Sequence, residues 1–253
     1  MTRPNARPAL LALALGAAAA GPVAAQEAPG AAQAAEHYAG IAADADVSLA
    51  EPLVQGTSES GDNPWACASC HGAQGEGAET VPRLAGLPAG YIVKQLHDYA
   101  SGARKNENMQ YVVARLDDNE MAALGAYYSE LVAPASAAPS LGGDMALGRK
   151  LALEGAWGVD MPSCFSCHGP AGWGVEQAFP PIAGQHAAYI NTQLANWKSG
   201  RRANAPVRLM HAVAAVMSSD DMAAVSDYLA SLPPVQPAGE QAIPVSARET
   251  EDE

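Results

Sequence analysis

Apolar residues recur every three or four positions in four stretches of the chain, a spacing that places side chains on one face of a helix. These stripes are Ile92, Leu96 and Tyr99; Met121, Leu124, Tyr128 and Leu131; Ile190, Leu194 and Trp197; and Met222, Val225, Leu229 and Leu232. No segment alternates apolar and polar residues over the length of a strand. The pattern therefore predicts an all-α protein.

Two of these helices have recognisable starts. Asp117 precedes the acidic Asp118 and Glu120, and Ser218 stands at capping-box spacing before Asp221, with Asp in the position that Glu usually holds. We therefore expect the second and fourth stripes to begin at these residues.

A further helix is predicted over residues 143–155, where Asp144 is a suitable N-cap and Gly155 a suitable stop. The corresponding stretch earlier in the chain, residues 47–56, contains Pro52. Because proline removes a hydrogen bond from a helix interior, this earlier helix is expected to be shorter, kinked or shifted.

The chain contains an internal repeat. Residues 84–96 match residues 182–194 at an offset of 98, with seven of thirteen positions identical, and residues 109–121 lie over 210–222. A period near 100 residues predicts two small domains rather than a solenoid of short repeats. The join falls in residues 132–143, where Pro, Ser, Ala and Gly replace the apolar periodicity.

The chain begins like an export signal. Arg3 and Arg7 precede an apolar run over residues 9–20, and small residues before Gln26 fit a cleavage site. The alternative, an uncleaved anchor, would have an apolar run short of the roughly 18 residues that a membrane span needs. Residues 26–44 and 236–253 lack helical periodicity. The predicted divisions are a signal peptide at 1–25, a mobile leader at 26–44, domain 1 at 45–133, a linker at 134–140, domain 2 at 141–235 and a disordered acidic tail at 236–253.

The formal net charge of the whole chain is -13, and residues 1–25 hold two arginines and no acid, so the mature chain carries -15. This charge argues against nucleic acid and anionic membrane surfaces as partners. The expected location is the periplasm, with the protein either free or held loosely at the membrane by a partner.

The four cysteines form two strings, "CASCH" at residues 67–71 and "CFSCH" at residues 164–168. Two disulfides, a thioredoxin-like motif or one zinc site could use some of these residues. Two complete Cys-x-x-Cys-His copies in an exported chain instead favour c-type haem, in which both thiols bind the porphyrin and the histidine binds iron. The predicted cofactors are two covalently bound haem c groups, attached through Cys67, Cys70, Cys164 and Cys167, with His71 and His168 as iron ligands.

Each string is followed by "PRLAG" or "PPIAG", by "YIVKQLHDYASGAR" or "YINTQLANWKSGRR", by a methionine and by an amphipathic helix. This order resembles the two-haem class I cytochromes c, in particular the cytochrome c4 family, over nearly all of residues 45–233. The resemblance implies two tandem class I cytochrome c domains, each wrapped around one haem, with histidine and methionine on both irons.

Met109 and Met210 occupy the methionine position in the two copies and are the expected sixth ligands. Three more residues separate Met210 from the repeated glycine than separate Met109, so Met217 and His211 are alternatives in domain 2. Met210 is preferred because residues 210–222 match 109–121 in length. Met121 and Met222 lie on apolar helix stripes and are assigned to core packing.

A ligating histidine usually donates its other ring proton to an acceptor. By resemblance, the carbonyls of Pro82 and Pro180 are candidates for this role, with a simple turn at each proline as the alternative. Tyr91, Trp197 and Arg83 are candidates for contacts with the haem propionates.

The resemblance implies a soluble carrier of single electrons between respiratory-chain proteins, towards a membrane terminal oxidase, and not an enzyme. One alternative is a two-haem, peroxidase-like enzyme with one five-coordinate iron, and another is a cytochrome subunit of a dehydrogenase complex. Matching methionines in both copies favour the carrier, because an enzyme needs one domain to break the symmetry. We expect no small-molecule substrate and no nucleic acid.

Overall fold

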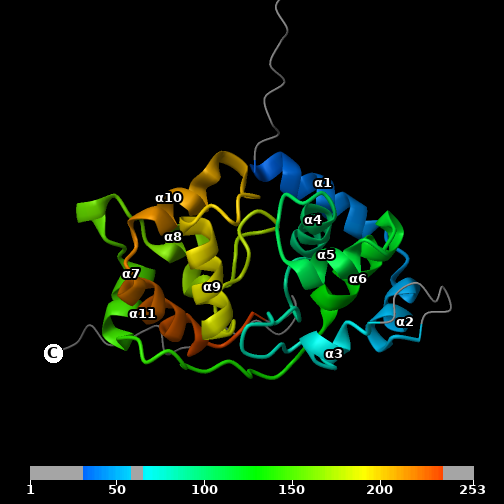
Figure 1. Ribbon diagram of the computed structural model, residues 1–253, viewed down its shortest axis with the longest axis horizontal. Helices are drawn as coiled ribbons and strands as arrows, with labels where there is room; N and C mark the ends of the chain where they lie inside the picture. The colour runs from blue at the N-terminus through cyan, green and yellow to red at the C-terminus, as the bar shows by residue number, and fades with distance from the viewer. Residues whose placement is uncertain (1–30, 58–64, 236–253) are drawn as a thin grey trace, which may run out of the picture.

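The computed structural model describes residues 31–57 and 65–235, which form two helical lobes joined by one extended segment (Figure 1). The first lobe contains α1 (Ala31–Ala43), η1 (Val47–Leu49), α2 (Ala50–Gln55), α3 (Ala68–His71), α4 (Ala89–Ala100), α5 (Glu107–Val113) and α6 (Asp118–Glu130). The second contains α7 (Met145–Leu153), η2 (Trp157–Val159), α8 (Cys164–His168), η3 (Pro170–Gly172), α9 (Ala187–Lys198), η4 (Pro206–Arg208), α10 (Leu209–Val216) and α11 (Ser219–Ala230). Within these described ranges the regular elements are all helices, which confirms the all-α prediction.

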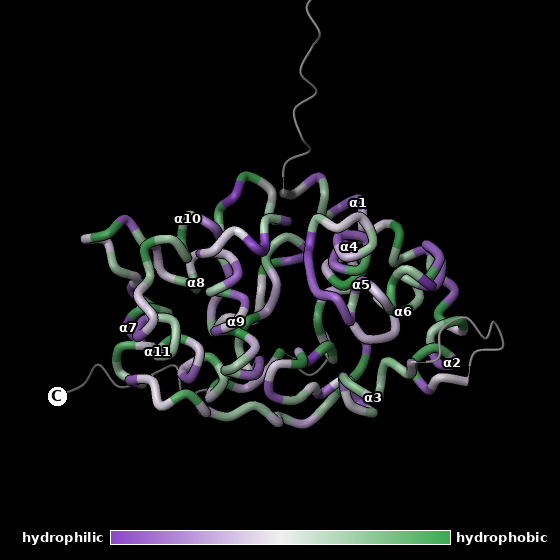
Figure 2. Tube along the Cα trace, in the orientation of Figure 1, coloured by the Kyte–Doolittle hydropathy of each residue, from purple (hydrophilic) through white to green (hydrophobic). Residues whose placement is uncertain are grey.

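The predicted apolar stripes form the two cores. In the first lobe α4 packs against α6, and Ile92, Leu96 and Tyr99 are buried between them with Met121 and Leu124. In the second lobe α11 packs against α7 and α9, burying the equivalent stripes. Figure 2 shows hydrophobic and hydrophilic residues following one another along these helices, as expected for helices that bury one face.

The predicted helix starts are confirmed. The Asp117 carboxylate accepts from the Glu120 N–H at 2.8 Å, and the Glu120 carboxylate accepts from the Asp117 N–H at 2.9 Å. Ser218 and Asp221 form the same capping box on α11. Asp144 caps α7, and Gly155 follows that helix with a φ of 75°, a conformation that favours glycine.

Pro52 shortens the first helix of lobe one, as predicted. The segment divides into η1 and α2, and Pro52 is the third residue of α2. The first turn of a helix has no intrahelical acceptor for its N–H groups, so proline costs no hydrogen bond there.

The predicted mobile leader is wrong for residues 31–43, which form α1. This helix packs on α4 and α6 and buries Ala35 and Ala42. A Cβ added at Gly90 would lie 2.7 Å from the Ala39 backbone nitrogen, so α1 and α4 approach too closely for a larger residue. Alanine has the highest helix propensity but gives a weak apolar stripe, which is why the sequence pattern missed this helix. The predicted signal peptide and acidic tail lie outside the described residues.

The segment between the lobes is fixed by two buried charged residues. Arg83 donates to the carbonyls of Ala85, Ala133 and Pro134, at 2.7 to 3.2 Å. Asp227 accepts from the backbone N–H groups of Ser140, Leu141 and Gly143. This linker is therefore held at both ends, and three protein carbonyls fix the Arg83 guanidinium, whose contact with a haem propionate stays a prediction.

Candidate haem centres

Both Cys-x-x-Cys-His strings form short helices. α3 begins after Cys67, and α8 begins at Cys164, where Ser163 accepts from the Ser166 N–H at 3.2 Å. Residues three apart lie on the same side of a helix, so each short helix brings its two sulfur atoms to one face. All four cysteines are unpaired.

The chemistry of the thiols argues against the redox and zinc alternatives. Burial raises the pKa of the Cys67 and Cys164 thiols to about 11. A thioredoxin-like cysteine is instead activated by a lowered pKa. Among residues 31–57 and 65–235, no three His, Cys, Asp or Glu side chains gather where they could hold a metal ion, so the two strings do not form one zinc site.

His71 and His168 are both buried and oriented by a proline carbonyl. The Nδ1 atom of His71 lies 2.9 Å from the Pro82 oxygen, and that of His168 lies 2.7 Å from the Pro180 oxygen. These contacts confirm the predicted acceptors. Burial lowers the pKa of both imidazoles, which keeps them neutral. Because a carbonyl only accepts, Nδ1 carries the proton and the Nε2 lone pair is left for a metal.

The two methionines predicted as ligands lie against the cores of their own lobes. Met109 on α5 packs against the first cluster, and Met210 on α10 packs against the second, each partly buried. By contrast, Met121, Met217 and Met222 are buried core residues. His211 is anchored through Nδ1 to the Trp197 carbonyl oxygen at 2.8 Å. The ligand roles of Met109 and Met210 remain predictions.

The lobes meet through side chains that repeat at the offset of 98. Arg104 donates to Gln95 of its own lobe at 3.0 Å and across the interface to Tyr189 at 2.8 Å and Gln193 at 3.0 Å. Arg202 donates to Gln193 of its own lobe at 2.9 Å and across to Gln95 at 3.2 Å. The two arginines also form an isolated antiparallel backbone bridge. The interface therefore has approximate two-fold symmetry.

A family model for cytochrome c matches residues 59–131 and residues 146–233, one match in each lobe. The chain belongs to the cytochrome c family. It is 48% identical over 181 residues to a protein of Stutzerimonas stutzeri named thiosulfate dehydrogenase electron acceptor, covering 69% of this chain and 83% of that protein.

Two solved structures resemble this cytochrome. Reduced cytochrome c4 from Pseudomonas stutzeri matches with a TM-score of 0.61 and 35% identity, covering 66% of this chain and 93% of that one. The thiosulfate dehydrogenase TsdBA from Marichromatium purpuratum matches with a TM-score of 0.71 and 37% identity, covering 74% of this chain and 40% of that one. The cytochrome is thus a dihaem electron carrier of the c4 kind with two covalently bound haem c groups, as predicted.

The interface arginines are residues that sequence reasoning missed. Both are buried, and neither forms an ion pair with a carboxylate within the part of the chain that the structure describes. Although burial alone would raise the pKa of Tyr189, Arg104 and Arg202 lower it below its usual value. Buried guanidinium groups without an anion cost several kcal/mol. The carboxylates of haem propionates would supply the missing charge, so the interface fits the cofactor.

A signal for these arginines was present in the sequence. Tyr, Gln and Arg recur at the same offset in both copies, as Tyr91, Gln95 and Arg104 and as Tyr189, Gln193 and Arg202. Each arginine also lies over an aromatic ring of its own lobe, Arg104 over Tyr99 and Arg202 over Trp197. Such repetition of polar residues is not required by helix formation and points to a shared ligand.

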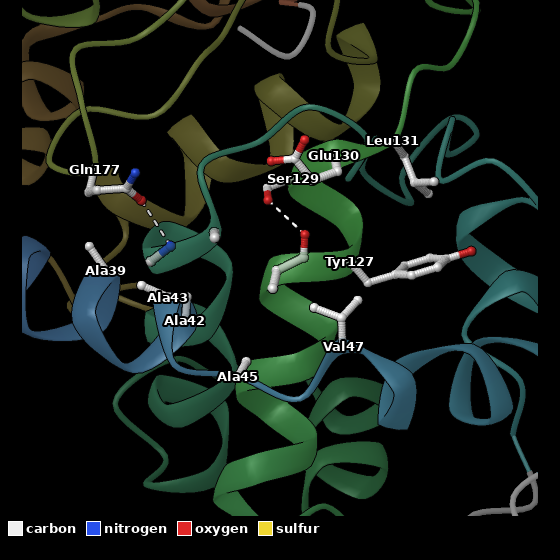
Figure 3. Close-up of a pocket in the computed structure, with 13 residues that line it drawn as sticks. Ala39, Ala42, Ala43, Ala45, Val47, Tyr127, Ser129, Glu130, Leu131 and Gln177 are labelled. Atoms are coloured by element: carbon white, nitrogen blue, oxygen red, sulfur yellow. Dashed lines mark hydrogen bonds between the residues drawn. The ribbon is translucent and has the colours of Figure 1, made fainter.

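Two surface pockets lie away from the cysteine strings. One, of about 540 Å³, opens between α1, α4 and α6, where Gln177 of the other lobe accepts from the Gly90 N–H at 2.8 Å (Figure 3). The other, of about 410 Å³, lies between the linker and α9. Neither is lined by a predicted haem ligand.

Among the described residues, no helix combines the length and apolar character needed to cross a bilayer.

Proposed function

We propose that this cytochrome is a periplasmic electron carrier that takes single electrons from a thiosulfate dehydrogenase and delivers them towards a membrane terminal oxidase. The donor is inferred from the relative named thiosulfate dehydrogenase electron acceptor and from the likeness to TsdBA. The domains proposed for this role remain 45–133 and 141–235, joined by residues 134–140, with α1 added to the first.

The proposed ligand set is the same in both domains. Cys67 and Cys70, or Cys164 and Cys167, hold the porphyrin by thioether bonds. His71 with Met109 and His168 with Met210 are the proposed axial pairs, and haem iron held in this way exchanges one electron at a time. The proline carbonyls support this assignment, because they fix the tautomer that each histidine needs.

The single observation that carries a carrier role, as opposed to an enzyme role, is the repetition of the site. Each lobe presents a buried histidine bonded to a proline carbonyl and a partly buried methionine against its core. With both axial positions filled by side chains, neither iron has a position open for a substrate. We therefore propose that the protein catalyses no reaction of its own.

The arginine interface supports electron passage between the domains. Arg104 and Arg202 each bond to residues of both lobes, so propionates bound to them would lie where the domains meet. These side chains would hold the two carboxylate edges in place and exclude water from between them.

Mixing the oxidised cytochrome with a purified thiosulfate dehydrogenase and thiosulfate tests the proposed donor. We expect rapid reduction of both haems with enzyme and substrate together, and none with thiosulfate alone. Reduction that is no faster with the enzyme than without it would contradict the donor. Gel filtration of the mixture separates a transient carrier, which elutes alone, from a fixed dehydrogenase subunit, which elutes with the enzyme.

A further inference from the structure

The helix that carries the proposed methionine ligand begins in a regular way in domain 1. Asn106 is the N-cap of α5, in an extended conformation, and its side chain accepts from the Met109 N–H at 3.0 Å. The Gln110 side chain in turn accepts from the Asn106 N–H at 3.3 Å. The backbone of Met109 is therefore clamped by a side-chain cap. Figure 2 shows the segment between α4 and α5 as hydrophilic, which suits such a cap.

The equivalent helix in domain 2 begins differently. The N-cap of α10 is Arg208, with a φ of 55°, and no side chain caps this helix. Val207 before it has a φ of 52°. Left-handed backbone is unfavourable for residues with a Cβ, and most of all for a β-branched residue such as valine. Two consecutive residues of this kind therefore place strain directly before Leu209, the first residue of α10, and so one residue before Met210.

Side-chain packing does not offset this strain, because Val207 is 83% exposed. The strain instead lies between two anchors. Arg202 is held at the interface by Gln193 and Gln95, and Met210 lies against the domain 2 core. Ten positions separate Gly200 from Met210, against seven from Gly102 to Met109. The extra length is taken up by the turn at η4, between the two anchors.

We propose that Met210 is the more weakly held of the two methionine ligands, so that domain 2 admits a small external ligand to its iron where domain 1 does not. The ligand class is a small carbon or nitrogen donor such as cyanide or imidazole. This inference rests on the ligand set of the proposed function. In the exchange with cyanide, the iron–sulfur bond breaks, an iron–carbon bond forms, the proton of hydrogen cyanide goes to solvent, and no oxidation state changes.

The two nearest alternative donors are not free to replace Met210. Met217 is buried in the core, and its carbonyl accepts from the Lys198 ammonium group. His211 directly follows Met210 on α10, so its side chain leaves the helix about 100° away from that of Met210, and the Trp197 carbonyl holds its Nδ1 in that direction. Withdrawal of Met210 relaxes the strained turn and leaves the axial position to a ligand from solution.

Cyanide titration of the oxidised, two-haem protein tests the proposal, with the methionine-to-iron charge-transfer absorption as readout. We expect this absorption to fall in two steps of equal size, with dissociation constants that differ by about tenfold or more. A double variant, Val207→Gly with Arg208→Gly, should move the first step towards the second, because glycine adopts left-handed backbone freely. Asn106→Ala, which removes the cap that holds Met109, should move only the second step, to lower cyanide concentration.

Two results would overturn the proposal: a single step for both haems, or a first step that the double glycine variant leaves unchanged. A rise in the thermal unfolding temperature of that variant shows separately that strain was removed. The ligand set is tested apart from the lability. If Met210→Ala leaves both methionine absorptions intact, the proposed ligand is wrong. If Met210→Ala removes one absorption but the unaltered protein loses both absorptions in a single cyanide step, only the lability fails.

Discussion

The histidine sides of the two domains are almost the same, whereas the methionine sides differ. His71 and His168 follow the cysteines on short helices and bond to proline carbonyls at 2.9 and 2.7 Å. On the other side, α5 starts with an asparagine cap, whereas two strained residues precede α10. The difference suggests one fixed geometry for attachment of the cofactor, whereas the methionine proposed as sixth ligand is held differently in each domain.

The largest expected effect comes from removing one methionine at a time. Met210→Ala should open one iron and lower its midpoint potential by on the order of 0.1 V, within the span of roughly 0.8 V that axial ligands control. Met109→Ala should do the same to the other haem. Each variant leaves the untouched domain with its original potential in a spectroelectrochemical titration. A shift of both haems by the same amount in either variant would contradict independent ligand sets.

Variants of the interface arginines should instead affect both haems, because each arginine is bonded to residues of both domains. Arg104→Gln and Arg202→Gln should each lower the potentials of both haems, since loss of a positive charge disfavours the reduced state. Each variant would also leave a haem propionate buried without its cation, which should cost about 3 to 5 kcal/mol in the free energy of unfolding. Urea denaturation of the two-haem protein measures this cost.

Arg201→Gln is the matched control for the arginine prediction. Arg201 is exposed and adjacent to Arg202, so the variant makes the same change of charge without touching the interface. It should leave the unfolding free energy within about 0.5 kcal/mol of the original. Equal destabilisation by Arg201→Gln and Arg202→Gln would exclude a special role for the buried group.

Helix caps give a smaller and symmetric effect. Asp117→Ala and Ser218→Ala each remove a capping box from the last helix of a domain. Each should cost about 1 kcal/mol in the free energy of unfolding, without changing either haem potential. A change of potential on loss of a cap would mean that these helices position the methionines, contrary to the separate starts of α5 and α10.

Much of the fold could be predicted from the sequence, because it depends on local signals. Helix stripes, the capping residues Asp117 and Ser218, and the effect of Pro52 all act within a few residues of chain. Helix α1 was missed because alanine contributes little to an apolar stripe, and its position depends on the close approach of Gly90.

The residues of the candidate site also fall into two groups, those with a local signal in the sequence and those without one. Short strings of residues identify the cysteines and histidines, whereas Arg104 and Arg202 act through partners in the other domain, 85 to 107 positions away along the chain. The contacts of Arg83 with three linker and loop carbonyls could not be predicted from its sequence position. Contacts that form only on folding leave no signal in neighbouring residues, and for the two arginines the available signal is the repetition of Tyr, Gln and Arg at an offset of 98.

The smallest expected effect concerns the partner. Without the predicted signal peptide the chain carries a charge of -15, which should attract a basic redox protein, and salt screens such attraction beyond a Debye length of about 8 Å at physiological ionic strength. The rate of electron exchange with a basic partner should therefore fall moderately as salt is added. Stopped-flow rates that do not depend on ionic strength would remove charge as the steering force.

A redox titration of the two-haem protein, followed by low-temperature spectra of both haems, tests the electron-carrier account most directly. The account predicts two low-spin signals, each with histidine and methionine on the iron, in the absence of any external ligand. A haem that stays high-spin throughout the titration would show an open iron position, and would identify the protein as an enzyme.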